Sequence, residues 1–519
     1  MPSRRTFLLS AASLALAGRG TTADPLPADL SLADIGDRFR AGKLTSRQLT
    51  EHYLRRIEEI DRRGPTLNSV IELNPDALAL ADACDRAKKP RGPLHGVPVL
   101  IKDNLATADK METTAGSLAL VGVRPPKDAF VVRKLRDAGA VILGKTNLSE
   151  WANFRASESM SGWSGRGGQT RNAHVLDRNP SGSSSGTGAA VAAELCAVGI
   201  GTETDGSIVS PSSVNGIVGL KPTVGLVGRT GIIPISASQD TAGPMGRTVR
   251  DVAILLGVIA GTDPDDPATA EAKVEADYTK FLDANGLKGA RLGVWRKMSG
   301  FKRKSLAVYE DCLRQLKAAG ATLIDDIDPP GFGESGDPEM TVLLYEFKQG
   351  VNDYLTWLGP KSPVKSLADV IAFNERNKDR ELVHFGQDLL IQANELGPLT
   401  EKRYTDALAA CRRRFRKDGI DAAMDKDKLD AIVAPTDGPA WLIDPVNLDA
   451  FAGSSSTPPA VAGYPSITVP AGFVRDLPVG LTFFGRAWTE PTLLKLAYAF
   501  EQATQARRAP KFRPSVGKE

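Results

Sequence analysis

The sequence predicts a layered α/β fold, in which helices pack against a β-sheet. Residues 96–101 (Gly-Val-Pro-Val-Leu-Ile) form a short apolar run with Gly and Pro at its start, which is typical of a buried strand. Residues 130–138 carry apolar side chains on one helical face, and the apolar run 141–143 follows Gly139. Strand, helix and strand therefore alternate along the chain, which favours an α/β architecture.

Six more segments have the pattern of a regular element. They are helices at 31–63, 189–195 and 492–504, and strands at 430–436, 463–470 and 480–485. The helix at 189–195 consists almost entirely of small apolar residues, so we expect it to be buried. The last two strands are close in sequence and are expected to pair.

The middle of the chain differs from both flanks. Residues 261–427 have the pattern of charged helices and loops, notably at 271–281, 306–318 and 339–357. Because this region lacks clustered small polar residues, we expect it to shape the substrate pocket, beside a catalytic core made of 90–260 and 428–505. A length of 519 residues suggests about three domains. A large α/β sheet can nevertheless hold such a chain in one unit, and we expect one domain over residues 24–519.

Composition argues against several functional classes. The chain is 42% hydrophobic and 24% charged, and its 65 basic and 62 acidic residues give a net charge of +3. The charges are interspersed, so we expect neither a nucleic acid nor a charged membrane surface as partner. The four cysteines and four histidines are scattered, without Cys-x-x-Cys or His-Glu-x-x-His. We therefore expect no metal and no cofactor, and the sequence gives neither a disulfide pairing nor an oligomeric state.

The N-terminus has the pattern of an export signal. Arg4 and Arg5 precede a largely apolar run at 7–17, which ends in the small-x-small pattern Ala-Leu-Ala. This run is too short to span a bilayer, and no cysteine follows it for lipid attachment. The pattern predicts a removable twin-arginine signal over residues 1–23, with a frayed basic N-terminus as the alternative. It also predicts a bacterial protein that is exported folded to the periplasm or secreted, without a membrane anchor.

Two segments rich in small residues indicate a built site. Residues 181–188 are dense in Ser and Gly, which by composition alone favours a flexible linker. However, the predicted buried helix follows directly, and backbone amides at a helix start can face a ligand. Residues 199–207 again place small residues beside hydroxyls and end at Ser207. A linker would not carry such flanks.

A serine nucleophile needs a base, and Lys102 is the candidate. A serine hydroxyl is a poor nucleophile until a neighbouring group takes its proton. No histidine lies in a motif, but a lysine can serve when burial lowers its pKa to roughly 7 to 8. Lys102 directly follows the apolar run 96–101 and is therefore a candidate for burial. Alone this signal is weak, because most lysines are solvated.

In combination, these segments resemble the amidase signature family. The likeness runs from about residue 32 to 509 and rests on motifs at 96–104, 113–117, 144–150, 181–186, 201–207, 219–223, 240–244 and 465–472. The resemblance implies a single large domain built on a twisted mixed β-sheet that is covered on both faces by α-helices. It also implies an amidase that uses a Ser-cisSer-Lys triad and an acyl-enzyme.

Carried over by position, the resemblance assigns roles to individual residues. Ser207 is the nucleophile, Ser183 is the bridging serine that follows a cis peptide, and Lys102 is the base. The family's oxyanion hole corresponds to the backbone N–H groups of Thr204, Asp205, Gly206 and Ser207.

Five further residues are candidates for substrate binding. The segment 113–117 resembles a loop that lines the acyl pocket, which gives Thr113, Ala115, Gly116 and Ser117. An ordinary polar turn is the alternative for this segment. Ser184 is the fifth candidate, with a role in forming the loop as its alternative.

Departures from the family pattern indicate a sub-branch. The family's Gly-Gly-Ser-Ser-Gly-Gly is Ser-Gly-Ser-Ser-Ser-Gly at 181–186 in this chain. Val209 stands where many members have arginine, so an acid–arginine pair cannot form there. The run 202–208 (Thr-Glu-Thr-Asp-Gly-Ser-Ile) is similar to the peptide amidases, which implies hydrolysis of the C-terminal carboxamide of peptides.

Other functions remain as alternatives. An aryl- or aliphatic-amide hydrolase of the same family is one, and a non-catalytic binding protein on the same scaffold is another. The intact Lys102, Ser183 and Ser207 argue against the binding protein. The predicted export signal and the absence of a basic patch argue against an amidotransferase subunit that acts on charged tRNA.

Overall fold

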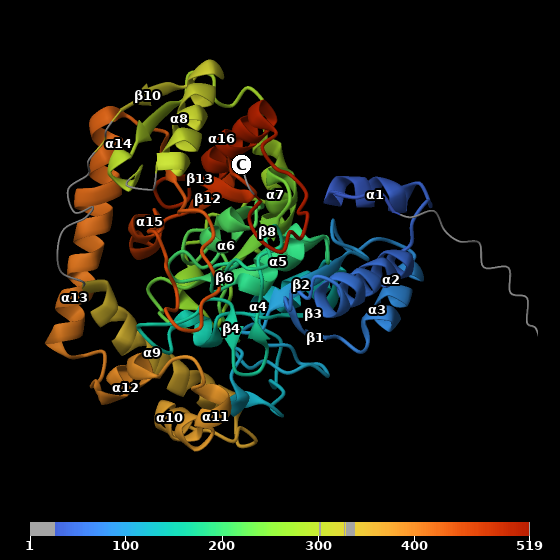
Figure 1. The fold of residues 1–519 in the computed structure, drawn as a ribbon, viewed down its shortest axis with the longest axis vertical. Helices are drawn as coiled ribbons and strands as arrows, with labels where there is room; N and C mark the ends of the chain where they lie inside the picture. The colour runs from blue at the N-terminus through green and yellow to red at the C-terminus, as the bar shows by residue number, and fades with distance from the viewer. Residues whose placement is uncertain (1–25, 300–302, 326, 328–337, 518–519) are drawn as a thin grey trace, which may run out of the picture.

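One large mixed sheet organises the molecule. The computed structural model describes residues 26–299, 303–325, 327 and 338–517 (Figure 1). Within these residues, eleven strands form the sheet. In spatial order they are β1 (Val70–Leu73), β3 (Val141–Thr146), β2 (Pro98–Lys102), β6 (Val198–Glu203), β8 (Thr241–Gly246), β7 (Val218–Lys221), β12 (Ser466–Val474), β13 (Leu477–Phe484), β11 (Ala431–Pro435), β9 (Arg291–Val294) and β10 (Thr322–Ile324).

The strand directions change along the sheet. Strand β2 runs parallel to both β3 and β6, whereas β6, β8, β7, β12, β13 and β11 pair with one another antiparallel. At the far edge, β11, β9 and β10 are parallel again. The sheet is therefore mixed, and the carboxyl ends of β2 and β6 meet at one edge.

Helices flank this sheet along its length (Figure 1). They are α1 (Leu32–Arg40), α2 (Ser46–Arg56), α3 (Ala77–Asp85), α4 (Phe130–Asp137), α5 (Ser185–Ala192), α6 (Val209–Val214), α7 (Val249–Ile259), α8 (Arg303–Ala318), α9 (Pro338–Leu358), α10 (Leu367–Arg376), α11 (Lys378–Glu381), α12 (Asp388–Glu395), α13 (Lys402–Arg412), α14 (Ala422–Asp427), α15 (Thr457–Ala462) and α16 (Glu490–Thr504). Helices α9 to α13 pack on one another beside the sheet, whereas α5 packs directly on β2, β3, β6 and β8. The result is a single α/β domain, as the sequence predicts.

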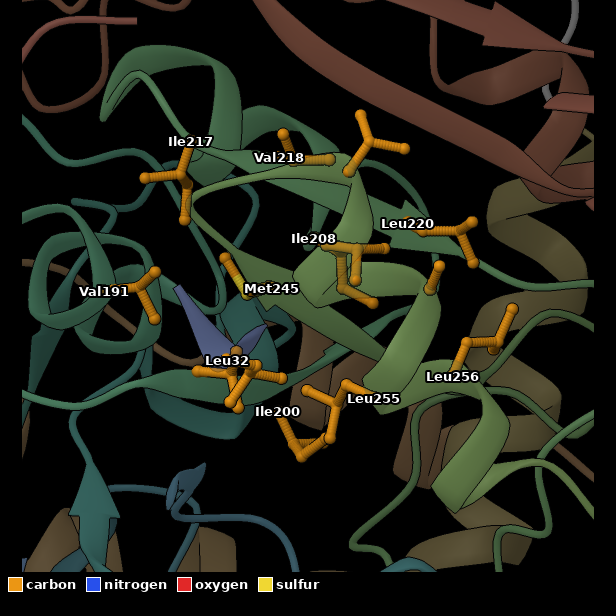
Figure 2. Close-up of a cluster of buried hydrophobic side chains, with 14 of the residues drawn as sticks. Leu32, Val191, Ile200, Ile208, Ile217, Val218, Leu220, Met245, Leu255 and Leu256 are labelled. Carbon is orange, nitrogen blue, oxygen red and sulfur yellow. The ribbon is translucent and has the colours of Figure 1, made fainter. Parts of the chain in front are cut away.

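The core forms where α5 and α7 meet the central strands. Figure 2 shows Val191 of α5 and Leu255 of α7 with Ile200 of β6 and Met245 of β8, all of them fully buried. Helix α5 has apolar and small residues on all sides, which is why it lies inside the molecule. Burial of this helix fixes the loop that precedes it, residues 181–184.

Most predicted elements are confirmed, and two are corrected. The expected helix at 31–63 is broken between α1 and α2, because Gly42 takes a φ of 63° and Thr45 caps α2 with a capping box. Helix α2 then continues into a π-helix, Ile57–Arg63. Residues 271–281 contain only a short 3₁₀ helix, Tyr278–Phe281. Tyr278 is the one buried side chain in this segment, so a longer helix would have no apolar face to pack.

Two predictions concern termini and membranes. The predicted signal, residues 1–23, lies outside the described residues. In the part of the chain that the structure describes, no helix has both the length and the apolar character needed to cross a bilayer. All four cysteines are described, and each is buried and outside any disulfide.

Candidate active site

The site forms at the carboxyl ends of two parallel strands. Strand β2 ends at Lys102 and its neighbour β6 ends at Glu203. The turn 204–207 continues from β6, and the loop 181–184 leads into α5, which packs on both strands. Segments far apart in the sequence are thus brought together at one edge of the sheet.

Lys102 is buried and bonded to two hydroxyl groups. Its Nζ lies 2.7 Å from Ser183 Oγ, 2.9 Å from Thr202 Oγ1 and 3.3 Å from the carbonyl oxygen of Thr202. Burial lowers the pKa of the Lys102 ammonium to about 7, although the carboxylates of Asp240 and Glu203 act in the opposite direction. A lysine with this pKa can accept a proton near neutral pH.

Ser183 is held by the glycine before it. The Gly182–Ser183 peptide bond is cis, and the Ser183 carbonyl oxygen accepts a hydrogen bond from Ser149 N at 3.2 Å. A Cβ on Gly182 would lie 2.2 Å from Ser149 Oγ, so any side chain at this position would displace the Ser149 hydroxyl. The Ser183 hydroxyl is thereby kept within hydrogen-bond distance of Lys102.

Ser207 and its neighbours line the same cleft. The Ser207 carbonyl oxygen accepts a hydrogen bond from Ser184 N at 3.2 Å, which joins the turn after β6 to the start of α5. Gly206 has a φ of 79°, a conformation that glycine adopts without strain. Within the described residues, the N–H groups of Gly206 and Ser207 donate to no protein acceptor. Two backbone donors are therefore available beside the Ser207 hydroxyl.

Side-chain contacts hold this turn in place. The Asp205 carboxylate accepts hydrogen bonds from Ser456 Oγ and, at 2.6 Å, from Thr457 Oγ1. Glu203 Oε2 accepts from the backbone N–H groups of Ile208 and Val209, at 2.8 and 3.0 Å. The carboxylate thus binds backbone amides at the position where many family members have an arginine. Burial raises the pKa of Glu203, and the charge of Lys221 partly offsets this effect.

The cleft above these residues has a volume of about 600 Å³. Its lining comes from segments 152–161, 181–183, 204–210 and 441–457, together with Ile235 and Leu343. We call residues 441–457 the rim segment. It is tied to the body of the protein by Asp449, whose carboxylate accepts from Ser161 Oγ at 2.6 Å and from Asn179 Nδ2 at 3.1 Å. Phe451 and Val446 of this segment are 47% and 84% exposed, which gives the cleft an apolar rim.

The five predicted substrate-binding residues lie outside this lining. Thr113, Ala115, Gly116 and Ser117 form a buried turn. Their hydrogen bonds lead to Asp103, Lys145 and Glu381 rather than into the cleft. Ser184 Oγ donates to the Thr202 carbonyl oxygen and accepts from Thr202 N, so it joins α5 to β6. These contacts are those of a supporting layer beneath the site.

Two features of the site were missed by sequence reasoning. Thr202, which is hydrogen-bonded to Lys102, lies in the motif 201–207. Its position near the end of β6 could have indicated that it belongs to the site. The rim segment has no periodic pattern, and its anchor Asp449 contacts Ser161, a residue 288 positions away. Nothing local in the sequence indicates that pairing.

The fold is a single α/β domain whose sheet edge holds a buried lysine beside serine hydroxyls, and the comparisons identify its family. A model of the family described as Amidase matches residues 48–494, so the chain belongs to the amidase family. It is 44% identical to a probable amidase of Arabidopsis thaliana, over 93% of this chain and 92% of that protein. It is 36% identical to a putative amidase of Schizosaccharomyces pombe, over 94% and 88%.

Solved structures give the same classification. A crystal structure of the peptide amidase PAM in complex with the competitive inhibitor chymostatin matches with a TM-score of 0.90 and 53% identity. The match covers 93% of this chain and 99% of that chain. The protein is therefore a hydrolase of carboxamide C–N bonds with the amidase signature fold.

The comparisons correct the predicted location. We expected a bacterial protein in the periplasm or secreted, but the relatives just described come from a plant and a fungus. These cells have no bacterial periplasm, so membership of the family does not imply that compartment. The prediction of a periplasmic or secreted bacterial protein is wrong.

Proposed function

We propose that this chain is a peptide amidase that hydrolyses the C-terminal carboxamide of peptides through Ser207, Ser183 and Lys102. One observation carries the proposal: a buried lysine with a pKa of about 7 lies 2.7 Å from Ser183 Oγ, and Ser183 lines the same cleft as Ser207. The 53% identity to a peptide amidase supports the substrate class. The apolar rim of the cleft supports it as well, since an amidated peptide carries side chains that could pack there.

The proposed reaction has two stages. Neutral Lys102 takes a proton from Ser183 while Ser183 takes one from Ser207, and the Ser207 oxygen attacks the carboxamide carbon. The oxyanion forms beside the free N–H groups of Gly206 and Ser207, at the positions predicted for the oxyanion hole. Ser183 gives a proton to the leaving nitrogen and takes one back from Lys102, and ammonia departs. Water then attacks the acyl-enzyme, passes a proton to Lys102 through Ser183, and this proton returns to Ser207 as the acid leaves.

The proposal also assigns a role to each part of the chain. Residues 90–260 and 428–505 supply the reacting groups and their supports, and residues 261–427 shape the space around them. Leu343 of α9 is the contribution of this middle region to the cleft lining. The rim segment lies within the proposed core, so that core also supplies part of the substrate-binding surface.

Release of ammonia tests the proposal. The purified chain is incubated with an amidated tetrapeptide, with an aryl amide and with a small aliphatic amide, and ammonia is measured. We expect the peptide amide to have the highest kcat/KM. Ser207→Ala should lower it by at least about a thousandfold, as loss of a nucleophile does, whereas the exposed Ser515→Ala should leave it unchanged. Near-normal turnover by Ser207→Ala would falsify the assigned nucleophile, and a preference for the aryl or aliphatic amide would refute the substrate class.

A further inference from the structure

A chain of hydrogen bonds reaches from a buried carboxylate to the wall of the cleft. Asp437 follows β11 and is fully buried, and its two carboxylate oxygens accept from Ser210 Oγ and Ser213 Oγ. Ser210 Oγ in turn lies 2.7 Å from Ser181 Oγ. Ser181 and Ser210 both line the cleft, so this chain ends at the substrate space.

The carboxylate fixes the direction of each hydrogen bond. A serine hydroxyl has one hydrogen and two lone pairs, and an ionised carboxylate only accepts. Because the Ser210 hydrogen points at Asp437, Ser210 can only accept from Ser181. The Ser181 hydrogen is therefore also committed, and Ser181 Oγ presents only lone pairs to the cleft. At the other carboxylate oxygen, Ser213 Oγ donates to Asp437 and accepts from Gly480 N at 2.9 Å, so the Ser213 hydrogen is committed in the same way.

The position of Ser181 suits contact with the reacting amide. Two peptide units separate Ser181 from Ser183, and one of them is cis, so their Cα atoms lie at most about 6.7 Å apart. Ser181 has a φ of 59°, in the left-handed region that disfavours residues with a Cβ. The family pattern has glycine here. Ser181 keeps a side chain despite this conformation, and its hydroxyl is the group that meets Ser210.

We propose that Ser181 Oγ accepts an N–H of the substrate carboxamide and makes the enzyme prefer amides to esters. Ser210 and Asp437 act as positioning residues, because they aim the Ser181 lone pairs at the cleft. A carboxamide offers two N–H donors, whereas an ester of the same acid offers none. A site built to bind an N–H discriminates against an analogue that lacks it. The inference rests on the proposed function, since it names a contact of the same substrate.

The test compares an amidated peptide with the methyl ester of the same peptide. Assays are run at pH 8, because burial raises the pKa of Asp437 to about 7 and the carboxylate must be ionised. Ser181→Gly removes the hydroxyl and suits the backbone conformation, so we expect this variant to fold. Its kcat/KM for the amide should fall about three- to tenfold, the effect of one lost hydrogen bond, and its kcat/KM for the ester should stay within about twofold. Ser210→Ala should shift the ratio in the same direction, and Ser515→Ala should not shift it.

Each outcome of this experiment either supports or overturns the inference about Ser181. An equal loss for amide and ester, or no loss for either, in Ser181→Gly would overturn the inference and leave the proposed peptide amidase intact. If the unmodified enzyme cleaves neither substrate, the proposed function fails, and this inference fails with it. A lower amide-to-ester ratio with an unchanged ester rate supports it, because a merely structural loss would affect both substrates.

Discussion

The strongest prediction concerns the acid limb of the pH profile. The ordinary lysine pKa of 10.5 leaves about one lysine in 3,000 neutral at pH 7, whereas a pKa of about 7 leaves half of them neutral. Burial of Lys102 therefore raises the population of its neutral amine by about three orders of magnitude. Only the neutral amine accepts a proton, so activity requires a pH above the pKa. We expect kcat/KM to be level above about pH 8 and to fall about tenfold per pH unit below about pH 6.

The assay is ammonia release from an amidated peptide between pH 5 and pH 9, with circular dichroism at each pH to establish that the protein stays folded. The profile of kcat/KM gives the pKa of the free enzyme. Lys102→Arg supplies the second arm, because a guanidinium keeps its proton throughout this range. This variant should lose at least about a thousandfold in kcat/KM, while Lys127→Arg on the exposed surface should behave like the parent. Activity that stays level down to pH 5, or an active Lys102→Arg enzyme, would refute the assignment of the base.

Three further predictions follow from single contacts. Thr202→Val removes the hydroxyl that lies 2.9 Å from Lys102 Nζ. We expect kcat to fall about tenfold and KM to change little. An unchanged kcat would show that this hydrogen bond is dispensable. In Gly186→Ala, the new Cβ would lie 2.3 Å from the Ser69 carbonyl oxygen. Urea unfolding should therefore show a free energy of unfolding that is lower by about 1–3 kcal/mol or more. A variant as stable as the parent would contradict this close packing. Phe451→Ala should raise KM for amidated peptides but not for a small aliphatic amide, because the ring is 47% exposed on the rim. An equal rise in KM for both substrates would argue against a contact between this ring and a side chain of the peptide.

The sequence predicted elements well where burial and periodicity agree. The run 96–101 is apolar and is followed by Lys102, and residues 98–102 form the fully buried strand β2 with Lys102 at its end. By contrast, helical composition alone misled at 271–281, because a helix without an apolar face gains nothing from packing. Local patterns were reliable only where the tertiary structure gave the segment something to pack against.

The site was predictable only in part. Lys102 and Ser183 are 81 positions apart, and no local pattern links them; the pairing came from the resemblance to a family. The cleft wall at 441–457 could not be predicted in that way, because none of the motifs that carry the resemblance lies in this segment. Its position depends on Asp449 and on contacts across the whole chain, which are consequences of the fold rather than of a motif.

The rim segment is hydrogen-bonded to the turn that carries Ser207, and this gives a last prediction. Thr457 donates to the carboxylate of Asp205, and the backbone of Asp205 lies in the turn proposed to form the oxyanion hole. A change on the open rim, such as Phe451→Ala, should therefore alter KM alone. Thr457→Val keeps the shape but removes the hydroxyl, so the turn loses a support and kcat should fall about three- to tenfold. Thr457→Ser retains the hydroxyl and should restore most of the activity. If Thr457→Val changes only KM, or if Thr457→Ser is as impaired as Thr457→Val, the rim and the turn act independently.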